Sequence, residues 1–221
     1  MTDPLILTGH KPVAQGLQRA VYLHPTDETK LVKVLLSQPE TQKRSGFGNW
    51  AERTFPSVRY RQVRKEHLEY QRIVRSNPQL DFHPPIGRIY GFVETDLGMG
   101  SLSEKVVDET GGLAVTLQAL LEDPPLDATF LKLLNTTITR LYDLNIRAGD
   151  LKPRNFVFGQ RYSAEKLGAT ECVLIDGFGD IHAIPIRSLS RWTNHIGLDD
   201  SCRRMARRGL VWDAKARQFS T

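Results

Sequence analysis

The chain has 221 residues, of which 40% are apolar and 25% charged, and this balance is typical of a globular protein rather than a disordered one. The formal net charge of +5 suits an anionic partner, but it does not choose between a nucleotide, a nucleic acid and a membrane surface. The two cysteines, Cys172 and Cys202, fit neither a metal-site spacing nor a disulfide framework, so we expect two reduced structural thiols.

The N-terminal segment has no basic region and only a short apolar run, which argues against a secretory signal. No apolar stretch approaches the ~20 residues that a membrane helix needs. We therefore expect a cytoplasmic protein without a membrane span.

The first third of the chain is predicted to form short strands, because runs rich in Val, Leu and Ile are separated by Gly, Pro and Asp. These runs cover residues 4–9, 20–25 and 30–36. Residues 37–62 are polar and interrupted by Gly and Pro, which favours an extended loop, and we expect it to act as a mobile flap. Residues 63–76 carry apolar side chains at helical spacing, and Asn77-Pro78 is expected to end this helix.

The rest of the chain shows further strand and helix signals and then a basic tail, from residue 187, that is helical in part. Strand signals cover residues 86–100, 155–159 and 171–176. Helical periodicity covers residues 117–121 and 128–144, with Asp127 as the predicted N-cap of the longer helix. This order predicts an α+β fold in which a small antiparallel β lobe with one helix joins a mainly helical lobe, with a cleft between them.

Polar residues of complementary chemistry gather in the loop that follows the longer helix. Asp150 is placed to orient a hydroxyl group and accept its proton, and Lys152 is placed to meet a phosphoryl group. Asn155 offers a neutral oxygen suited to Mg²⁺. Asp176, at the end of the predicted strand 171–176, is the second candidate oxygen ligand. A strand pair ending in Asn155 and Asp176 would put two oxygen ligands side by side, as phosphoryl transfer requires.

The sequence GDLKPRN around this loop resembles the catalytic loop of the protein-kinase-like superfamily, and IDGFGD resembles its magnesium-binding element. The resemblance implies ATP and Mg²⁺ as cofactors, with Lys33 as the phosphate-binding lysine. Glu69 would pair with that lysine, and Glu66, one turn earlier, is the alternative. Gly16 stands where the glycine-rich phosphate loop belongs, and Glu94 opens a segment, to Gly98, that would cross between the lobes and bind adenine through its backbone.

A closer resemblance, over about residues 5–185, is to the bacterial YrbL family of PhoP regulatory network proteins, which are grouped with the kinase-like folds. It implies one kinase-like domain, with residues 1–95 as the N-terminal lobe and 96–221 as a reduced C-terminal lobe. The sequence departs from the kinase pattern at Ala148 and Gly177, where a histidine and a phenylalanine are expected. No Ala-Pro-Glu element follows Asp176, which argues against a platform for protein substrates.

Two functions are consistent with these residues. The first is a phosphotransferase that uses ATP and Mg²⁺ on an unknown hydroxyl acceptor, either a small molecule or a dedicated partner protein. The second is a non-catalytic nucleotide-binding module linked to two-component signalling. The basic stretches do not interleave aromatic with base-reading side chains, so we expect no nucleic-acid partner, and the histidines show no metal spacing.

Overall fold

The computed structural model describes residues 3–16, 19–36, 60–79, 82–163, 166–179, 190–206 and 209–221. The chain divides into two compact units, Met1–Arg64 with Ile89–Lys105, and Lys65–Arg88 with Val106–Thr221. Nearly all of the predicted flap lies outside the described residues. This division differs from the sequence boundary at residue 95, because Ile89–Lys105 stays with the first unit and most of the first helix belongs to the second.

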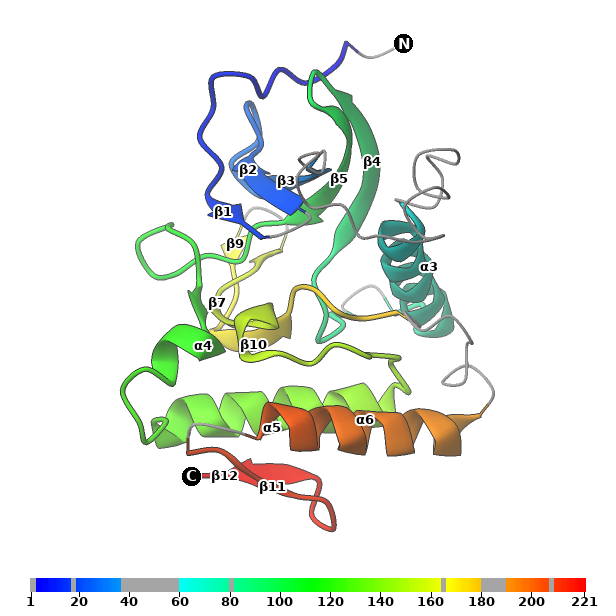
Figure 1. Ribbon diagram of the computed structural model, residues 1–221, viewed down its shortest axis with the longest axis vertical. Helices are drawn as coiled ribbons and strands as arrows, with labels where there is room; N and C mark the ends of the chain where they lie inside the picture. Colours follow the sequence, from blue (N-terminus) through cyan, green and yellow to red (C-terminus); the bar gives the residue numbers. More distant parts are fainter. Residues whose placement is uncertain are drawn as a thin grey trace, which may run out of the picture. The chain divides into compact units, whose positions relative to one another are not determined.

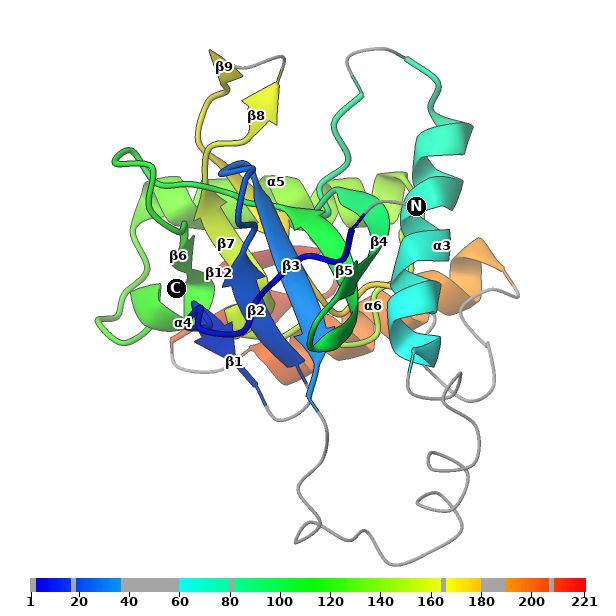
Figure 2. The same cartoon turned by 90° about the horizontal axis from the view of Figure 1, so that it is seen from above.

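The first unit is built on a five-stranded antiparallel sheet in the order β1-β2-β3-β5-β4 (Figures 1 and 2). Its strands are β1 (Ala14–Gln15), β2 (Arg19–Leu23), β3 (Lys30–Leu35), β4 (Ile89–Thr95) and β5 (Gly98–Glu104). The predicted strands at 20–25 and 30–36 are confirmed by β2 and β3. They are joined by a turn in which the Lys30 amide donates to the Asp27 carbonyl oxygen.

Alternating apolar side chains of β2 and β3 form the core of this sheet. The buried residues of this core are Leu7, Ala20, Tyr22, Val32 and Val34. Lys33 therefore has a buried valine on each side of it in β3, and it lies opposite Val21 of β2 and Ser101 of β5.

The segment predicted as a first strand, residues 4–9, does not form one. Leu5 makes only an isolated bridge to Thr95, and the chain then turns. The amides of Leu7 and Thr8 donate to the Asp96 carboxylate instead of to a neighbouring strand. The apolar run that suggested a strand is still used, because it delivers the fully buried Leu7 to the core.

The prediction that Glu94–Gly98 crosses between the lobes is wrong. These residues form the tight turn of the β4–β5 hairpin, with Glu94 opposite Met99 and Thr95 opposite Gly98. The carbonyl oxygen of Glu94 accepts a hydrogen bond from the Leu5 amide, so it already has a partner within the first unit. The whole hairpin belongs to the first unit, and the chain next enters the second unit at Val106.

The second unit contains most of the helical residues (Figure 1) and a small sheet of order β10-β7-β6. Its helices are α3 (Arg61–Ser76, of which the first turn lies in the first unit), α4 (Leu117–Leu120), α5 (Ala128–Asp143) and α6 (Arg191–Met205). Its strands are β6 (Val115–Thr116), β7 (Phe156–Gly159), β8 (Tyr162–Ser163), β9 (Lys166–Leu167), β10 (Glu171–Leu174), β11 (Val211–Asp213) and β12 (Gln218–Ser220). These elements confirm the predicted α+β class, and each predicted helix is present.

Side chains cap α5 and α6, and the first of these caps was predicted from the sequence. Asp127 accepts a hydrogen bond from the Thr129 amide, which confirms it as the N-cap of α5. Ser190 forms a capping box with Thr193 at the start of α6. The two helices lie side by side (Figure 1), and the Tyr142 hydroxyl of α5 donates to the Asp199 carboxylate of α6.

Both cysteines are free and buried, as expected for structural thiols. Burial raises the pKa of the Cys172 thiol, which keeps it protonated and unreactive near neutral pH. Among the described residues, no helix is long and apolar enough to cross a membrane.

Candidate active site

The strand pair predicted to carry Asn155 and Asp176 is confirmed. Strands β7 and β10 are antiparallel neighbours, with Phe156 opposite Leu174. Asn155 directly precedes β7, and Asp176 comes two residues after the end of β10. The Ile175 amide donates to the Asn155 carbonyl oxygen at 2.8 Å, which continues the ladder by one step. The two candidate oxygen ligands therefore lie at the same end of one hairpin.

The loop from Asp150 to Asn155 is held against that end of the hairpin by hydrogen bonds. The Asp150 amide donates to the Gly177 carbonyl oxygen at 3.2 Å, and the Asn155 side-chain amide donates to the Asp150 carbonyl oxygen at 3.0 Å. Pro153 begins a single 3₁₀ turn, η1 (Pro153–Asn155), where its missing amide hydrogen costs nothing. The backbone of the candidate acid is thus fixed by both candidate ligand segments.

The side chains of Asp150 and Lys152 form an ion pair, with 2.9 Å between Nζ and Oδ2. Both side chains are partly exposed, so this contact is weak and can exchange for another partner. An acid and a cation that share one face of the loop provide both groups that phosphoryl transfer needs beside its acceptor.

Glycines let the segment after Asp176 pass close to its neighbours. Gly177 has φ +83°, and a Cβ there would run into the Asp150 carbonyl oxygen and lie 2.9 Å from Nδ2 of Asn155. Gly179 has φ +95°, and a Cβ there would lie 3.0 Å from the carbonyl group of Lys65 in α3. The departure from the kinase pattern at Gly177 therefore has a steric reason, since no larger side chain fits between Asp176 and the loop.

The donor set at this end of the hairpin fits a magnesium ion. Asn155 is buried and gives its amide nitrogen to the Asp150 carbonyl, so its amide oxygen is the atom that can bind a metal ion. Asp176 supplies a carboxylate, and hard oxygens of these two kinds suit Mg²⁺, which keeps several of its ligands as water or phosphate. In the part of the chain that the structure describes, no group of three or more His, Cys, Asp or Glu side chains forms a metal cluster.

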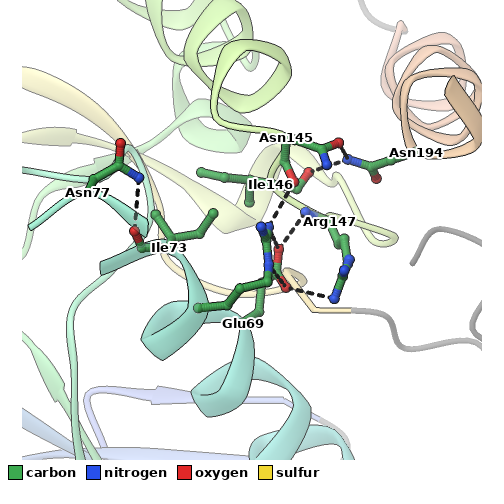
Figure 3. A network of polar contacts seen from close by, with 8 residues as sticks. Glu69, Ile73, Asn77, Asn145, Ile146, Arg147 and Asn194 are labelled. Carbon is green, nitrogen blue, oxygen red and sulfur yellow. Dashed lines mark hydrogen bonds and ion pairs between the residues drawn. The ribbon is translucent and has the colours of Figure 1, made fainter. Parts of the chain in front are cut away.

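Glu69, predicted to pair with Lys33, has its carboxylate bound to two arginines (Figure 3). Arg72 donates to both oxygens, and the backbone amide of Arg147 donates to Oε1 at 2.8 Å. The alternative, Glu66, is also buried, and the backbone at Gly179 packs against its amide. The structure therefore separates the two glutamates, because Glu69 contacts the start of the candidate catalytic loop at Arg147 and Glu66 lies where α3 meets the segment after Asp176.

The remaining predicted residues belong to the first unit. Lys33 is half-buried on the central strand β3. Gly16 follows β1, and its amide donates to the Arg19 carbonyl oxygen at 2.9 Å, so it belongs to the turn between β1 and β2. The two residues after Gly16 lie outside the described residues.

Sequence reasoning missed the residues that support the candidate catalytic loop, namely Arg72, Arg147 and Asn194. Asn194 is fully buried in α6 and donates to the Asn145 side chain and to the Ile146 carbonyl oxygen. The only signal was Asn145 itself, since an asparagine just past a helix often adopts a positive φ, and its φ is +49°. Arg72 gave no signal, because charged residues on a helix are usually solvated, and Arg147 lies in the loop after α5, where no local pattern marks it.

Comparison with known proteins identifies the family. The family model described as PhoP regulatory network protein YrbL matches residues 5–209. The chain belongs to the YrbL family. Curated YrbL proteins of Escherichia coli (strain K12) and Shigella flexneri are each 26% identical to it over 189 residues, which is 84% of this chain and 79% of theirs.

Solved structures similar to this YrbL-family chain include protein kinases. The kinase domain of Mycobacterium tuberculosis PknI is 16% identical, with a TM-score of 0.49, over 88% of this chain and 72% of that one. The apo form of PpkA is 14% identical, with a TM-score of 0.45, over 88% of this chain. The chain spans only 61% of the PpkA structure.

Proposed function

We propose that the protein is a kinase-like phosphotransferase that uses ATP and Mg²⁺ to phosphorylate a hydroxyl group. The observation that carries this proposal is the way in which the β7–β10 hairpin and the loop before it bring Asp150, Lys152, Asn155 and Asp176 together through backbone and amide hydrogen bonds. An acid, a cation and two oxygen ligands in one preorganised segment suit a reaction whose catalysis is mainly positioning and charge neutralisation.

Each residue has a defined role in the proposed reaction. Asp150 orients the acceptor hydroxyl and takes its proton, and Lys152 leaves its ion pair with Asp150 to neutralise the transferred phosphoryl group. Asn155 and Asp176 would hold the magnesium ion, which supplies charge neutralisation at the phosphates. Lys33 binds the phosphates of ATP, with Gly16 in the loop beside them, while the carboxylate of Glu69 is bound by two arginines.

One observation favours a second function, a nucleotide-binding regulatory module without catalysis. Lys152 pairs with Asp150 at 2.9 Å, so the carboxylate of the candidate acid faces a side chain of its own loop. If nucleotide binding does not break that pair, Asp150 stays turned toward Lys152 instead of toward an acceptor hydroxyl, and the protein would act through its ligand state alone. The family description, which refers to the PhoP regulatory network, suits such a role in two-component signalling.

Two substitutions separate the candidates. Asp176→Ala removes the charged magnesium ligand and is expected to weaken Mg·ATP binding, measured by calorimetry or thermal shift. Asp150→Asn keeps the size of the side chain and is expected to leave ATP affinity within about 1 kcal/mol of the parent, because the acid acts on the acceptor. For a phosphotransferase, turnover of γ-labelled ATP falls by orders of magnitude in Asp150→Asn.

For a regulatory module, Asp150→Asn has no effect in any functional assay, whereas Asp176→Ala weakens Mg·ATP binding. Unchanged Mg·ATP affinity in the double variant Asp176→Ala/Lys33→Ala would contradict both functions.

A further inference from the structure

We propose that Glu69 is a positioning residue that anchors the catalytic loop to α3, so that the placement of α3 sets the placement of Asp150. This inference rests on the proposed function for its catalytic consequence, while the anchoring itself is a property of the second unit alone. Glu69, Arg147 and Asp150 all belong to that unit.

The carboxylate of Glu69 binds two parts of the chain at once (Figure 3). Within α3, Arg72 donates from Nε at 3.0 Å and from Nη2 at 2.6 Å. From the start of the catalytic loop, the backbone amide of Arg147 donates at 2.8 Å and its guanidinium at 3.4 Å. Four donors on one carboxylate compensate its removal from water, since the Glu69 side chain is only 3% exposed.

These contacts exceed what an ordinary helix salt bridge provides. A pair between residues three apart on a helix surface is usually solvated and contributes a few tenths of a kcal/mol. Here the glutamate is buried, and one of its bonds goes to the backbone amide of Arg147, which is 78 residues away in the sequence. The bond therefore fixes where the loop backbone starts and not only how two side chains pair.

The anchored residue lies between the two segments that carry the proposed chemistry. The Arg147 amide is held by Glu69, and its carbonyl oxygen accepts a hydrogen bond from the Gly179 amide at 2.7 Å. The next residue, Ala148, bridges to Phe178 and Gly179. Asp150 follows two residues later, and its amide is bonded to Gly177. A displacement of Arg147 is therefore passed directly to Asp150 and to the segment after Asp176.

A second support comes from α6 and explains why the anchor is needed. Asn194 holds the Asn145 side chain at 2.9 Å and the Ile146 carbonyl oxygen at 3.1 Å, and Arg72 donates to the Asn145 carbonyl oxygen (Figure 3). Residues 145–147 are thus tied to α6 on one side and to α3 on the other. Glu69 and Arg72 provide the α3 contacts of this segment that carry charge.

The test uses Glu69→Gln, which keeps the shape of the side chain but replaces one acceptor oxygen with a donor that faces the arginines. Arg72→Ala removes the helix partner, and Arg75→Ala, at an exposed position one turn further along α3, is the matched control. Amide hydrogen exchange of the full chain is followed residue by residue. We expect the protection of the Arg147 amide to fall about tenfold or more in Glu69→Gln, with the β10 amides unchanged.

Enzymatic measurements then test the consequence for catalysis. In Glu69→Gln we expect kcat to fall about 10- to 100-fold, as for other residues that orient a reacting group, with Mg·ATP affinity within about threefold of the parent. Arg75→Ala should match the parent in both kcat and Mg·ATP affinity. Two results for Glu69→Gln would contradict the proposed anchoring role of Glu69. One is a loss of exchange protection at all amides together, and the other is unchanged exchange protection at the Arg147 amide.

The result for the parent protein separates this inference from the proposed function. If the parent does not bind Mg·ATP, the proposed function fails, and the exchange of the Arg147 amide still decides whether Glu69 anchors the loop. If the parent turns over ATP and Glu69→Gln loses exchange protection without losing kcat, the inference fails and the proposed function stands.

Discussion

The side-chain amide of Asn155 donates a hydrogen bond to the carbonyl oxygen of Asp150, and this 3.0 Å contact joins a candidate magnesium ligand to the candidate catalytic acid. It gives Asn155 two roles that can be measured separately. One is structural, because the bond closes the loop. The other belongs to the proposed function, in which the amide oxygen would bind the magnesium ion.

The structural role of Asn155 predicts a loss of stability without any ligand. Asn155→Ala removes a buried side chain and leaves the partly buried Asp150 carbonyl oxygen without this donor, so we expect the free energy of unfolding to fall by about 1–3 kcal/mol, measured by urea denaturation. Asn77→Ala is the control, because the Asn77 side chain also donates to a backbone carbonyl, that of Ile73, at a partly exposed helix end. A loss in Asn155→Ala no greater than that in Asn77→Ala would contradict this role.

Gly177 is predicted to tolerate no side chain. Its φ of +83° alone costs an alanine about 1–2 kcal/mol, and the added Cβ would also collide with the Asp150 carbonyl oxygen. Gly111 separates the two effects, because its φ is +81° and nothing lies within 4 Å of the position of its Cβ. We expect Gly177→Ala to lower the free energy of unfolding by clearly more than Gly111→Ala in the same urea titration. Equal losses would show that strain, and not the close approach, accounts for the effect.

The parts of this site that the sequence predicts are those set by local signals. Asp127 and the apolar spacing after it determine α5, because a cap and a helical period act over a few residues. The loop and the hairpin after it are predicted as well, since their residues are close together in the sequence. Asn155 and Asp176 therefore come together as expected.

The crossing at Glu94 was mispredicted because β5 lacks the usual strand residues. Its sequence, GMGSLSE, contains no β-branched residue, and it forms a strand because β3 and β4 flank it on both sides. Gly100 shows the tertiary reason for this composition, since a Cβ there would lie 2.8 Å from a methyl group of Val32. A residue without a side chain is needed at this position of β5, where strand propensity favours β-branched residues.

The Glu69 contacts could not be predicted, because they join residues far apart in the sequence. Nothing in the helix pattern distinguishes Glu69 from Glu66, since both are buried glutamates one turn apart. What separates them is the backbone of Arg147 on one side and that of Gly179 on the other.

Arg161 has no role in the proposed reaction, but we predict that it is essential for the stability of the fold. It is 2% exposed and donates to the carbonyl oxygens of Pro84 and Ile86 at 2.7 and 3.3 Å. Arg161→Met leaves both buried carbonyls without these donors, so we expect a loss of about 3 kcal/mol or more in the free energy of unfolding. Arg203→Met, at an exposed position of α6, should stay within about 0.5 kcal/mol of the parent. A near-neutral Arg161→Met in urea denaturation would contradict the prediction.

His67 of α3 predicts a pH dependence of stability. Burial lowers the pKa of the His67 imidazole below its usual value, so the folded protein favours the neutral ring. As the pH falls through the pKa of the unfolded chain, near 6.5, the unfolded state takes up a proton that the folded state resists, and stability declines. The decline ends once the pH is below the lowered pKa of the folded state.

His67→Gln removes this proton uptake, and a glutamine can still contact Gln71, whose side-chain nitrogen lies 2.8 Å from the His67 ring. Between about pH 7.5 and about pH 5.5, we therefore expect the free energy of unfolding to fall less in His67→Gln than in the parent. His10→Gln, at an exposed position of the first unit, should keep the parent's dependence. Urea titrations at the two pH values measure the free energy of unfolding of each variant. If it changes equally with pH in the parent and in His67→Gln, the pH dependence arises from other groups.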